Sequence, residues 1–348
     1  MTTDEGLIEA LTAFTEAFGP SGFEDQARAV VQEHAEQIAD EVSVDGAGNL
    51  WARIEGGAGR ETVLTAHLDE IGLMVSHVEE SGFARVAPIG SWDPVVLPAQ
   101  RLQFATDEGF VVGVVTSLPP HVTKGEAPSP TDLAELAVDI GAEDADEAER
   151  LGVLVGTPGV PATRLERMAG DAITAKALDN RAGCVTVLEA LRALAKDRPG
   201  GDVVAVFTTS EERDGSGAAL SARGIEPRLV VVVETTVAAD LPGVPPHRQV
   251  SRLGHGPALT VMDRYSTVSP RVVARLRALA AELDLEVQAK QPNIGGTDAA
   301  TWRRERPDLP CAVVATPCRG IHSAASVLRL ADLRATIALV EAAARDTE

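Results

Sequence analysis

Residues 172–194 read AITAKALDNRAGCVTVLEALRAL, and the rest of the chain is organised around them. The β-branched pair Ile173-Thr174 indicates a short strand, and apolar residues then recur at helical spacing from Ala182 to Leu194. Asp179 lies between the strand and the helix. Because Asp is a favoured N-cap residue, Asp179 is expected to cap the helix unless other residues offer its carboxylate a different role.

The same alternation of strand and helix patterns recurs on both sides of this segment. Five apolar runs indicate strands: VLTA at 63–66, AITA at 172–175, VVAVFTTS at 203–210, LVVVVE at 229–234 and CAVVATP at 311–317. Continuous apolar runs that alternate with helices predict a mostly parallel sheet sandwiched by helices, which is an α/β fold.

The first part of the chain carries three local signals. Leu7 to Ala17 has a helical pattern. Ser21 and Glu24 have the spacing of a capping box and predict the start of a second helix. The stretch VSVDGAGNLWARI at 42–54 alternates on both sides of a Gly/Asn turn, which indicates a hairpin.

The pattern changes from about Ser76 to Ala162. Short strands (FARVAPI, RLQFAT, GFVVGVV) are separated by Gly and Pro, and the Pro-rich segment VTKGEAPSPTD follows at 122–132. We therefore predict a small all-β module at residues 76–162, inserted into one α/β domain that is formed by residues 1–75 and 163–348.

The bulk properties exclude several partners. The formal net charge of −21 is unfavourable for binding nucleic acid or an anionic membrane surface. No apolar run approaches the ~18 residues of a membrane span, and the N-terminal MTTDEGLIEA lacks a signal-peptide pattern. The three cysteines have no ligand spacing, so we expect a cytoplasmic protein with reduced thiols.

Residues that can bind metal follow the ends of the predicted strands. They are His67 and Asp69 after VLTA, Asp179 after AITA, Glu211 and Glu212 after VVAVFTTS, Glu234 at the end of LVVVVE, and His322 after CAVVATP. Ligands of open α/β sheets bind beyond the carboxyl ends of the strands, so these side chains are expected to converge. Because the carboxylates would repel each other, the pattern predicts a pair of divalent metal ions.

Each metal of such a pair needs its own ligands and a shared one. Metals about 3.5–4 Å apart require a bridging carboxylate, and Asp179 is best placed for this role. His67 and Glu234 are the expected terminal ligands of one metal. Glu212 and His322 are those of the other.

Two further carboxylates are expected to support the chemistry. Asp69 can accept the second ring N–H of His67 and so fix its tautomer. Adjacent side chains on a strand point to opposite sides, so Glu211 and Glu212 are expected to differ in role. One of them binds metal, and the other is a general base for the attacking water.

With these motifs in view, the chain resembles the dinuclear aminopeptidases that assemble as tetrahedral particles, also called glutamyl aminopeptidases. The motifs that carry the resemblance are AHLDEIGLMV, KALDNRAG, SEERDGSGA, VVETTVAADLPG, PCRGIHS, GGTDA and SLPPH. The resemblance implies that one metal is bound by His67, Asp179 and Glu234. It implies that the other metal is bound by Asp179, Glu212 and His322. Glu211 is then the general base, and Asp69 supports His67.

The resemblance also implies a fold of the zinc-exopeptidase type and two divalent ions (zinc, cobalt or manganese) per subunit. It implies a homo-oligomer, often of twelve subunits, whose contacts involve the inserted module. The expected function is a metal-dependent aminopeptidase that removes N-terminal residues from peptides through a hydroxide bridging the two metals.

Three residues depart from the family pattern. Glu234 stands where the family usually has Asp, Arg213 stands where a small apolar residue usually follows the Glu pair, and Gly320 replaces a Tyr beside His322. The longer Glu234 side chain is expected to change the geometry of one metal. The other two departures are expected to affect specificity.

Two other functions are compatible with the motifs. A deacylase or carboxypeptidase-like dinuclear hydrolase would need an arginine for the substrate carboxylate, and Arg213 or Arg319 could provide it. A non-catalytic binding protein on the same fold is disfavoured, because binding alone does not need the spare carboxylate of Glu211.

Overall fold

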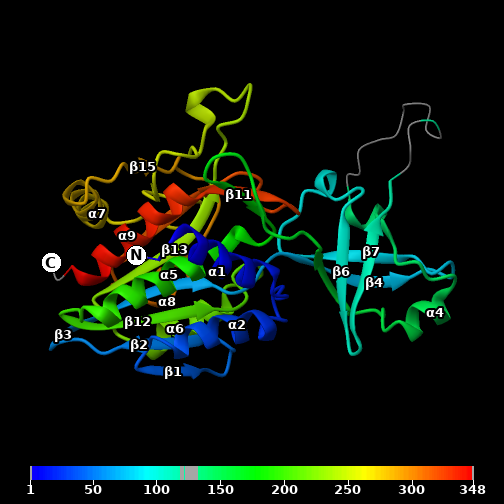
Figure 1. Ribbon diagram of the computed structural model, residues 1–348, viewed down its shortest axis with the longest axis horizontal. Helices are drawn as coiled ribbons and strands as arrows, with labels where there is room; N and C mark the ends of the chain where they lie inside the picture. The colour runs from blue at the N-terminus through cyan, green and yellow to red at the C-terminus, as the bar shows by residue number, and fades with distance from the viewer. Residues whose placement is uncertain (1, 118–120, 122–131, 347–348) are drawn as a thin grey trace.

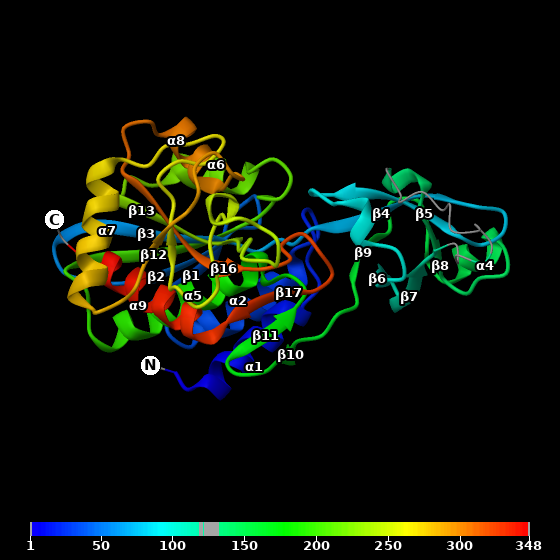
Figure 2. The same ribbon diagram turned by 90° about the horizontal axis from the view of Figure 1, so that it is seen from above.

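The computed structural model describes residues 2–117, 121 and 132–346. It consists of an α/β body and a smaller barrel that projects from one end of the body (Figure 1). The view from above shows the same separation (Figure 2). Residues 118–120 of the SLPPH motif and residues 122–131 of the Pro-rich segment lie outside the described residues.

The body is built on an eight-stranded sheet in the described part of the chain, with the order β1-β2-β12-β3-β13-β16-β14-β15. Its strands are β1 (Glu41–Val44), β2 (Leu50–Ile54), β3 (Gly59–His67), β12 (Gly201–Thr208), β13 (Leu229–Val237), β14 (Ala258–Leu259), β15 (Gln288–Ala289) and β16 (Cys311–Cys318). The central strands β12, β3, β13 and β16 run parallel to one another, and the β1–β2 hairpin is antiparallel. The predicted fold class is confirmed.

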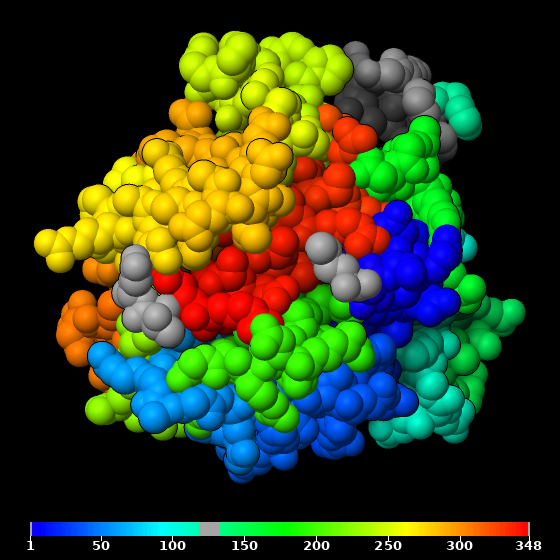
Figure 3. Space-filling view, turned by 60° about the vertical axis from the view of Figure 1, so that its left-hand side comes forward, coloured from blue at the N-terminus to red at the C-terminus, as the bar shows by residue number. Residues whose placement is uncertain are grey.

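Helices cover both faces of this sheet. They are α1 (Asp4–Glu16), α2 (Asp25–Glu36), α5 (Leu178–Lys196) and α9 (Leu330–Arg345) on one face, and α6 (Ser216–Gly224) and α8 (Asp298–Glu305) on the other. Alternate residues of a strand point to opposite faces of the sheet: Leu64 packs in the core that contains α5, and its neighbour Val63 packs in the core that contains α6. Helix α7 (Pro270–Glu282) packs beside α9, as Figure 3 shows in yellow and red.

The segment that leads to Asp179 does not belong to the main sheet. Strand β11 (Ala172–Ala175) lies in a separate antiparallel sheet between β10 (Glu166–Arg167) and β17 (Ser326–Arg329). The prediction that AITA at 172–175 belongs to the mostly parallel sheet is therefore wrong. Both edges of β11 are paired with these neighbours, which leaves no edge for the parallel sheet.

The barrel is closed and antiparallel, with the order β4-β5-β8-β7-β6-β9. Its strands are β4 (Gly72–Val78), β5 (Ala84–Ile89), β6 (Arg101–Thr106), β7 (Gly109–Val115), β8 (Ala137–Asp139) and β9 (Pro158–Pro161). Shorter elements are α4 (Ala145–Arg150), η1 (Pro94–Val96) and η2 (Leu133–Glu135) near the barrel and η3 (Pro246–Arg248) in the body. Leu73, Leu102 and Phe104 fill the barrel core. That residues 76–162 fold as an independent unit stays a prediction.

The predicted capping box of the second helix is wrong. Glu24 precedes α2 but makes no side-chain cap, and the Ser21 hydroxyl donates instead to the Asp69 carboxylate at 2.6 Å. A tertiary partner has therefore replaced the local one. Among the described residues, no helix combines the length and the apolar character that crossing a membrane requires.

Candidate metal centre and active site

The carboxyl end of β3 places His67 in the middle of the site. His67 is the last residue of β3 and is buried, as is Asp69 two residues later. The Nδ1 atom of His67 lies 3.0 Å from the carbonyl oxygen of Asp69 and 3.4 Å from its Oδ1. These contacts orient the ring so that Nε2 faces the carboxylates of the neighbouring strands.

Asp179 faces two histidines with two different oxygens. Its Oδ1 lies 3.5 Å from Nε2 of His67, and its Oδ2 lies 3.6 Å from Nε2 of His322. Asp179 does not cap the helix, because the side-chain oxygen of Asn180 accepts the N–H of Gly183 at 3.1 Å instead. The neighbouring asparagine thus caps the helix and leaves the Asp179 carboxylate available to the site.

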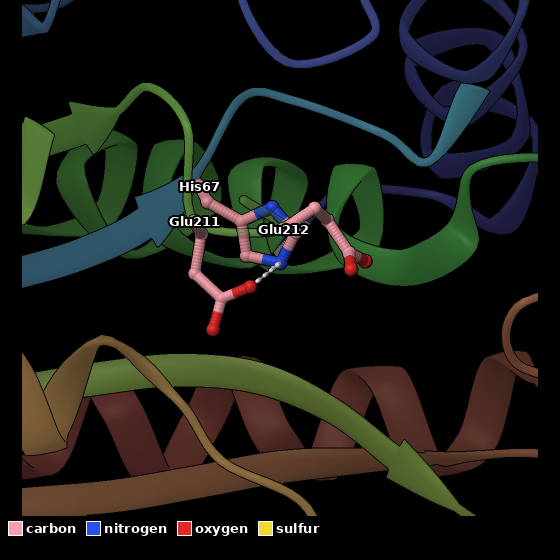
Figure 4. Close-up of side chains that lie close together, drawn as sticks. All are labelled: His67, Glu211 and Glu212. Atoms are coloured by element: carbon pink, nitrogen blue, oxygen red, sulfur yellow. Dashed lines mark ion pairs between the residues drawn. The ribbon is translucent and has the colours of Figure 1, made fainter. Parts of the chain in front are cut away.

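The Glu pair lies on a turn, not on the strand. Strand β12 ends at Thr208, and Ser210 has a left-handed φ of 60°. Because the strand does not continue, alternation does not separate the two side chains: both face the cluster. The Glu211 carboxylate approaches Nε2 of His67 at 4.0 Å (Figure 4), whereas Oε1 of Glu212 lies 3.1 Å from Nε2 of His322.

Glu234 completes one side of the site from β13. Its Oε2 lies 3.6 Å from Nε2 of His67, and the side chain is only 4% exposed. Its Oε1 atom is buried and has no hydrogen-bond partner among the described residues. An unpartnered carboxylate oxygen at this depth is costly, unless a cation is bound beside it.

The electrostatics of the site reflect this crowding of charge. Burial raises the pKa of Glu211 and of Glu234 well above the ordinary value. Burial by itself also disfavours a charged His322, but its contacts with Asp179 and Glu212 raise the pKa of His322 to about 11. Partial burial opposes the charged form of Asp179 as well, yet His322 and His67 hold its pKa well below its usual range. These shifts reflect the crowding of carboxylates, which bound divalent cations would relieve.

The donor set fits a pair of divalent ions. Two groups of three side chains have ligand atoms within 4.8 Å of one another and share Asp179: His67, Asp179 and Glu234 form one, and Asp179, Glu212 and His322 form the other. A third such group combines His67 with Glu211 and Glu212. Imidazole nitrogens and carboxylate oxygens are ligands for zinc, cobalt and manganese. The unpartnered Oε1 of Glu234 supports the fit.

The site opens into a cavity of about 460 Å³. Besides the cluster, its lining includes Arg264, Tyr265 and Lys290 together with Ile294 and Gly296, and Ser91 from the segment after β5. The sequence reasoning missed Arg264, Tyr265 and Lys290, because they lie in loops or short strands without a recognisable motif. Proximity to GGTDA was the one available signal, since Lys290 lies five residues before Gly295.

Two of the departures from the family pattern have a clear structural setting. Arg213 is exposed and does not line the cavity. Gly320 has a φ of +69°, and a Cβ built there would lie 2.9 Å from the carbonyl oxygen of Ala325, so a larger residue would be strained at this position.

Arg319, the other arginine that could have bound a substrate carboxylate, makes two hydrogen bonds to the carboxylate of Asp240, at 2.8 and 2.7 Å. Neither arginine is thus placed to bind a substrate carboxylate in the cavity.

The chain is similar to known aminopeptidases along nearly its whole length. The family model described as M42 glutamyl aminopeptidase matches residues 48–339. Lysyl aminopeptidase of Pyrococcus furiosus is 32% identical over 341 residues, covering 96% of this chain and 95% of its own.

Two solved structures share the fold closely. Aminopeptidase APDkam598 from the archaeon Desulfurococcus kamchatkensis has a TM-score of 0.93 and 34% identity, over 98% of this chain and 95% of its own. The TET1 peptidase of Pyrococcus horikoshii, which can assemble into a tetrahedron or a large octahedral shell, has a TM-score of 0.87 and 27% identity, over 98% and 99% of the two chains. This chain therefore belongs to the M42 glutamyl aminopeptidase family, a family of peptide-bond hydrolases.

Proposed function

We propose that the protein is an aminopeptidase that uses two divalent metal ions to remove N-terminal residues from peptides. One observation carries the proposal: the two oxygens of Asp179 face two separate histidines, each of which has a second carboxylate beside it. This arrangement fits one shared and four terminal ligands. His67 and Glu234 would hold one ion, and Glu212 and His322 the other.

The residues then divide the chemistry between them. The bound ions would polarise the scissile carbonyl and make an attacking water more acidic. Glu211 takes the proton of that water and passes it to the leaving amine. Asp69 keeps Nδ1 of His67 engaged so that Nε2 faces the ions.

The cavity favours an acidic first residue. Its acidic lining residues are Asp179, Glu211, Glu212 and Glu234, all of which belong to the metal cluster. The remaining charged side chains on the wall, Arg264 and Lys290, are cationic. A substrate with N-terminal Glu or Asp would therefore meet opposite charge, whereas N-terminal Lys would meet like charge.

A panel of aminoacyl and N-acetyl-aminoacyl peptides, assayed in turn with zinc, cobalt and manganese, tests the proposal. We expect metal-dependent release of N-terminal residues from free peptides, fastest for Glu or Asp. Release only from N-acetylated peptides would favour the deacylase alternative, and absence of hydrolysis with every metal would contradict an enzymatic role.

We also propose that the protein is a homo-oligomer. The TET1 peptidase of Pyrococcus horikoshii, which has the same fold, assembles into closed particles. On the barrel, β7 exposes Phe110, Val112 and Val114, with 49, 56 and 43% of their surfaces accessible. Such an apolar stripe on a strand is typical of a protein contact. Light scattering of the purified protein should give a mass of several subunits, and twelve if the particle is tetrahedral.

A further inference from the structure

The segment GPSGFE at residues 19–24 contacts the turn that carries Glu211 and Glu212, and its first residue is held by other parts of the body. The N–H of Glu70 donates to the carbonyl oxygen of Gly19 at 3.0 Å. Arg181, at the start of the long helix α5, is fully buried, and its guanidinium donates to the carbonyl oxygens of Phe14, Ala17 and Gly19. The segment is therefore held in place independently of the turn.

Glu24 of this segment binds the backbone of the turn. It is 7% exposed, and its Oε1 accepts the N–H of Gly22 at 2.9 Å and the N–H of Ser210 at 3.1 Å. Ser210 is the residue with a left-handed φ of 60°, a conformation that is unfavourable for a residue with a Cβ. The hydrogen bond from Ser210 to Glu24 stabilises this conformation where the chain leaves β12.

Ser21 acts on the same turn through Asp69. Both oxygens of the Asp69 carboxylate accept turn N–H groups, that of Glu211 on Oδ1 and that of Glu212 on Oδ2, each at 3.0 Å. The Ser21 hydroxyl donates to Oδ2 at 2.6 Å. Three consecutive N–H groups, from Ser210 to Glu212, are thus held by two buried carboxylates.

We propose that Ser21 and Glu24 are positioning residues that set the orientation of the Glu211–Glu212 turn, and with it the separation of the proposed base from the proposed metal ligand. The inference rests on the proposed function for the roles of the two glutamates. Its physical reason is that both side chains project from one short turn. A rotation of the turn moves Glu211 away from His67 and Glu212 away from His322 together.

The test compares Glu24→Met, which keeps the size but removes the acceptor, with Glu24→Gln, which keeps an acceptor oxygen. Asp25→Asn is the matched control, because Asp25 is the next residue and its carboxylate pairs with Arg28 on the surface. We expect Glu24→Met to lower kcat about 10–100-fold with KM within about twofold, and Glu24→Gln to restore most of kcat. Asp25→Asn should behave as the parent protein.

Calorimetric titration of the metal-free proteins with zinc and with manganese provides a readout that does not depend on hydrolysis. Glu24→Met should weaken one of the two binding events about tenfold or more, because only Glu212 of the pair is a proposed ligand. If Glu24→Met does not fold, Ser21→Ala, which removes one hydroxyl, should show the same kcat and metal effects in smaller measure.

A folded Glu24→Met or Ser21→Ala protein with the parent's kcat and metal affinities would overturn the inference, as would a Glu24→Gln protein as impaired as Glu24→Met. A parent protein that binds two metals but hydrolyses none of the peptides would contradict the proposed function instead, and the calorimetric comparison would still decide the positioning role.

Discussion

Replacement of Glu211 by glutamine separates general-base catalysis from metal binding. The amide has the shape of the carboxylate but cannot accept the water proton at neutral pH. The nearest contact of the Glu211 carboxylate to a histidine is 4.0 Å from Nε2 of His67, too long for a hydrogen bond. Its backbone N–H, which holds the turn to Asp69, is unchanged by the substitution. The turn should therefore keep its position.

The expected size of the effect follows from this geometry. Loss of the base should lower kcat about 10²–10⁴-fold, equivalent to about 3–5 kcal/mol of transition-state stabilisation. The metal content should stay near two per subunit, because Glu211 belongs to neither of the two groups that share Asp179.

Stability provides a second readout, for the metal-free protein. Burial raises the pKa of Glu211 above its value in the unfolded chain. The stability contributed by its protonated form is therefore complete below the unfolded-state pKa and is lost as the pH rises through the folded-state pKa. Glutamine does not titrate, so Glu211→Gln should become more stable relative to the parent as the pH increases.

The assays are steady-state kinetics on the best peptide of the panel, metal analysis by mass spectrometry, and urea unfolding of the metal-free proteins across pH. Asp107→Asn, on an exposed turn of the barrel, is the matched control for loss of one carboxylate. If Glu211→Gln loses one metal equivalent, the roles of Glu211 and Glu212 are reversed. If kcat is unchanged, Glu211 is not the base.

Three further predictions follow from the same geometry. Asp179→Asn should weaken binding of both metals, because a neutral amide bridges two cations poorly; calorimetry that shows one intact site would contradict the bridging role. Under mild chelation the metal beside Glu234 should leave first, and the Glu234→Asp variant should bind that metal more tightly than the parent protein does. Weaker binding in this variant, or two indistinguishable sites in the parent protein, would show that the longer side chain does not weaken the site. Val112→Lys on β7 should lower the particle mass in light scattering while the circular dichroism spectrum stays unchanged; an unchanged mass would exclude this strand from the subunit contact.

Much of the architecture can be predicted from the sequence, because it depends on local periodicity. The runs VLTA, VVAVF, VVVV at 230–233 and CAVVA are buried on both sides of the sheet. Because both faces are apolar, these runs can be recognised as strands without a structure. The hairpin at 42–54 has its own turn residues. The proposed metal ligands were also identified from the sequence, because they follow or end apolar runs that indicate strands.

The tertiary structure was needed wherever a distant partner replaces a local one. AITA has the pattern of a core strand, yet β10 and β17 pair with it in a separate sheet. Ser21 and Glu24 have the spacing of a capping box, but Asp69 and Ser210, far along the chain, are their partners. Local spacing cannot reveal a hydrogen bond whose second partner is brought near only by folding.

The division of roles within the site has the same origin. The residue types alone indicate a cluster of two histidines and several carboxylates that calls for cations. Three features of the site depend on loops instead. They are which oxygen of Asp179 faces which histidine, the position of the Glu pair on a turn after the strand, and the presence of Arg264 and Lys290 in the cavity lining. Loop conformations are set by long-range contacts. The periodicity of the sequence therefore predicts the strands and helices, whereas the relative positions of the side chains in the site are decided only by the packed structure.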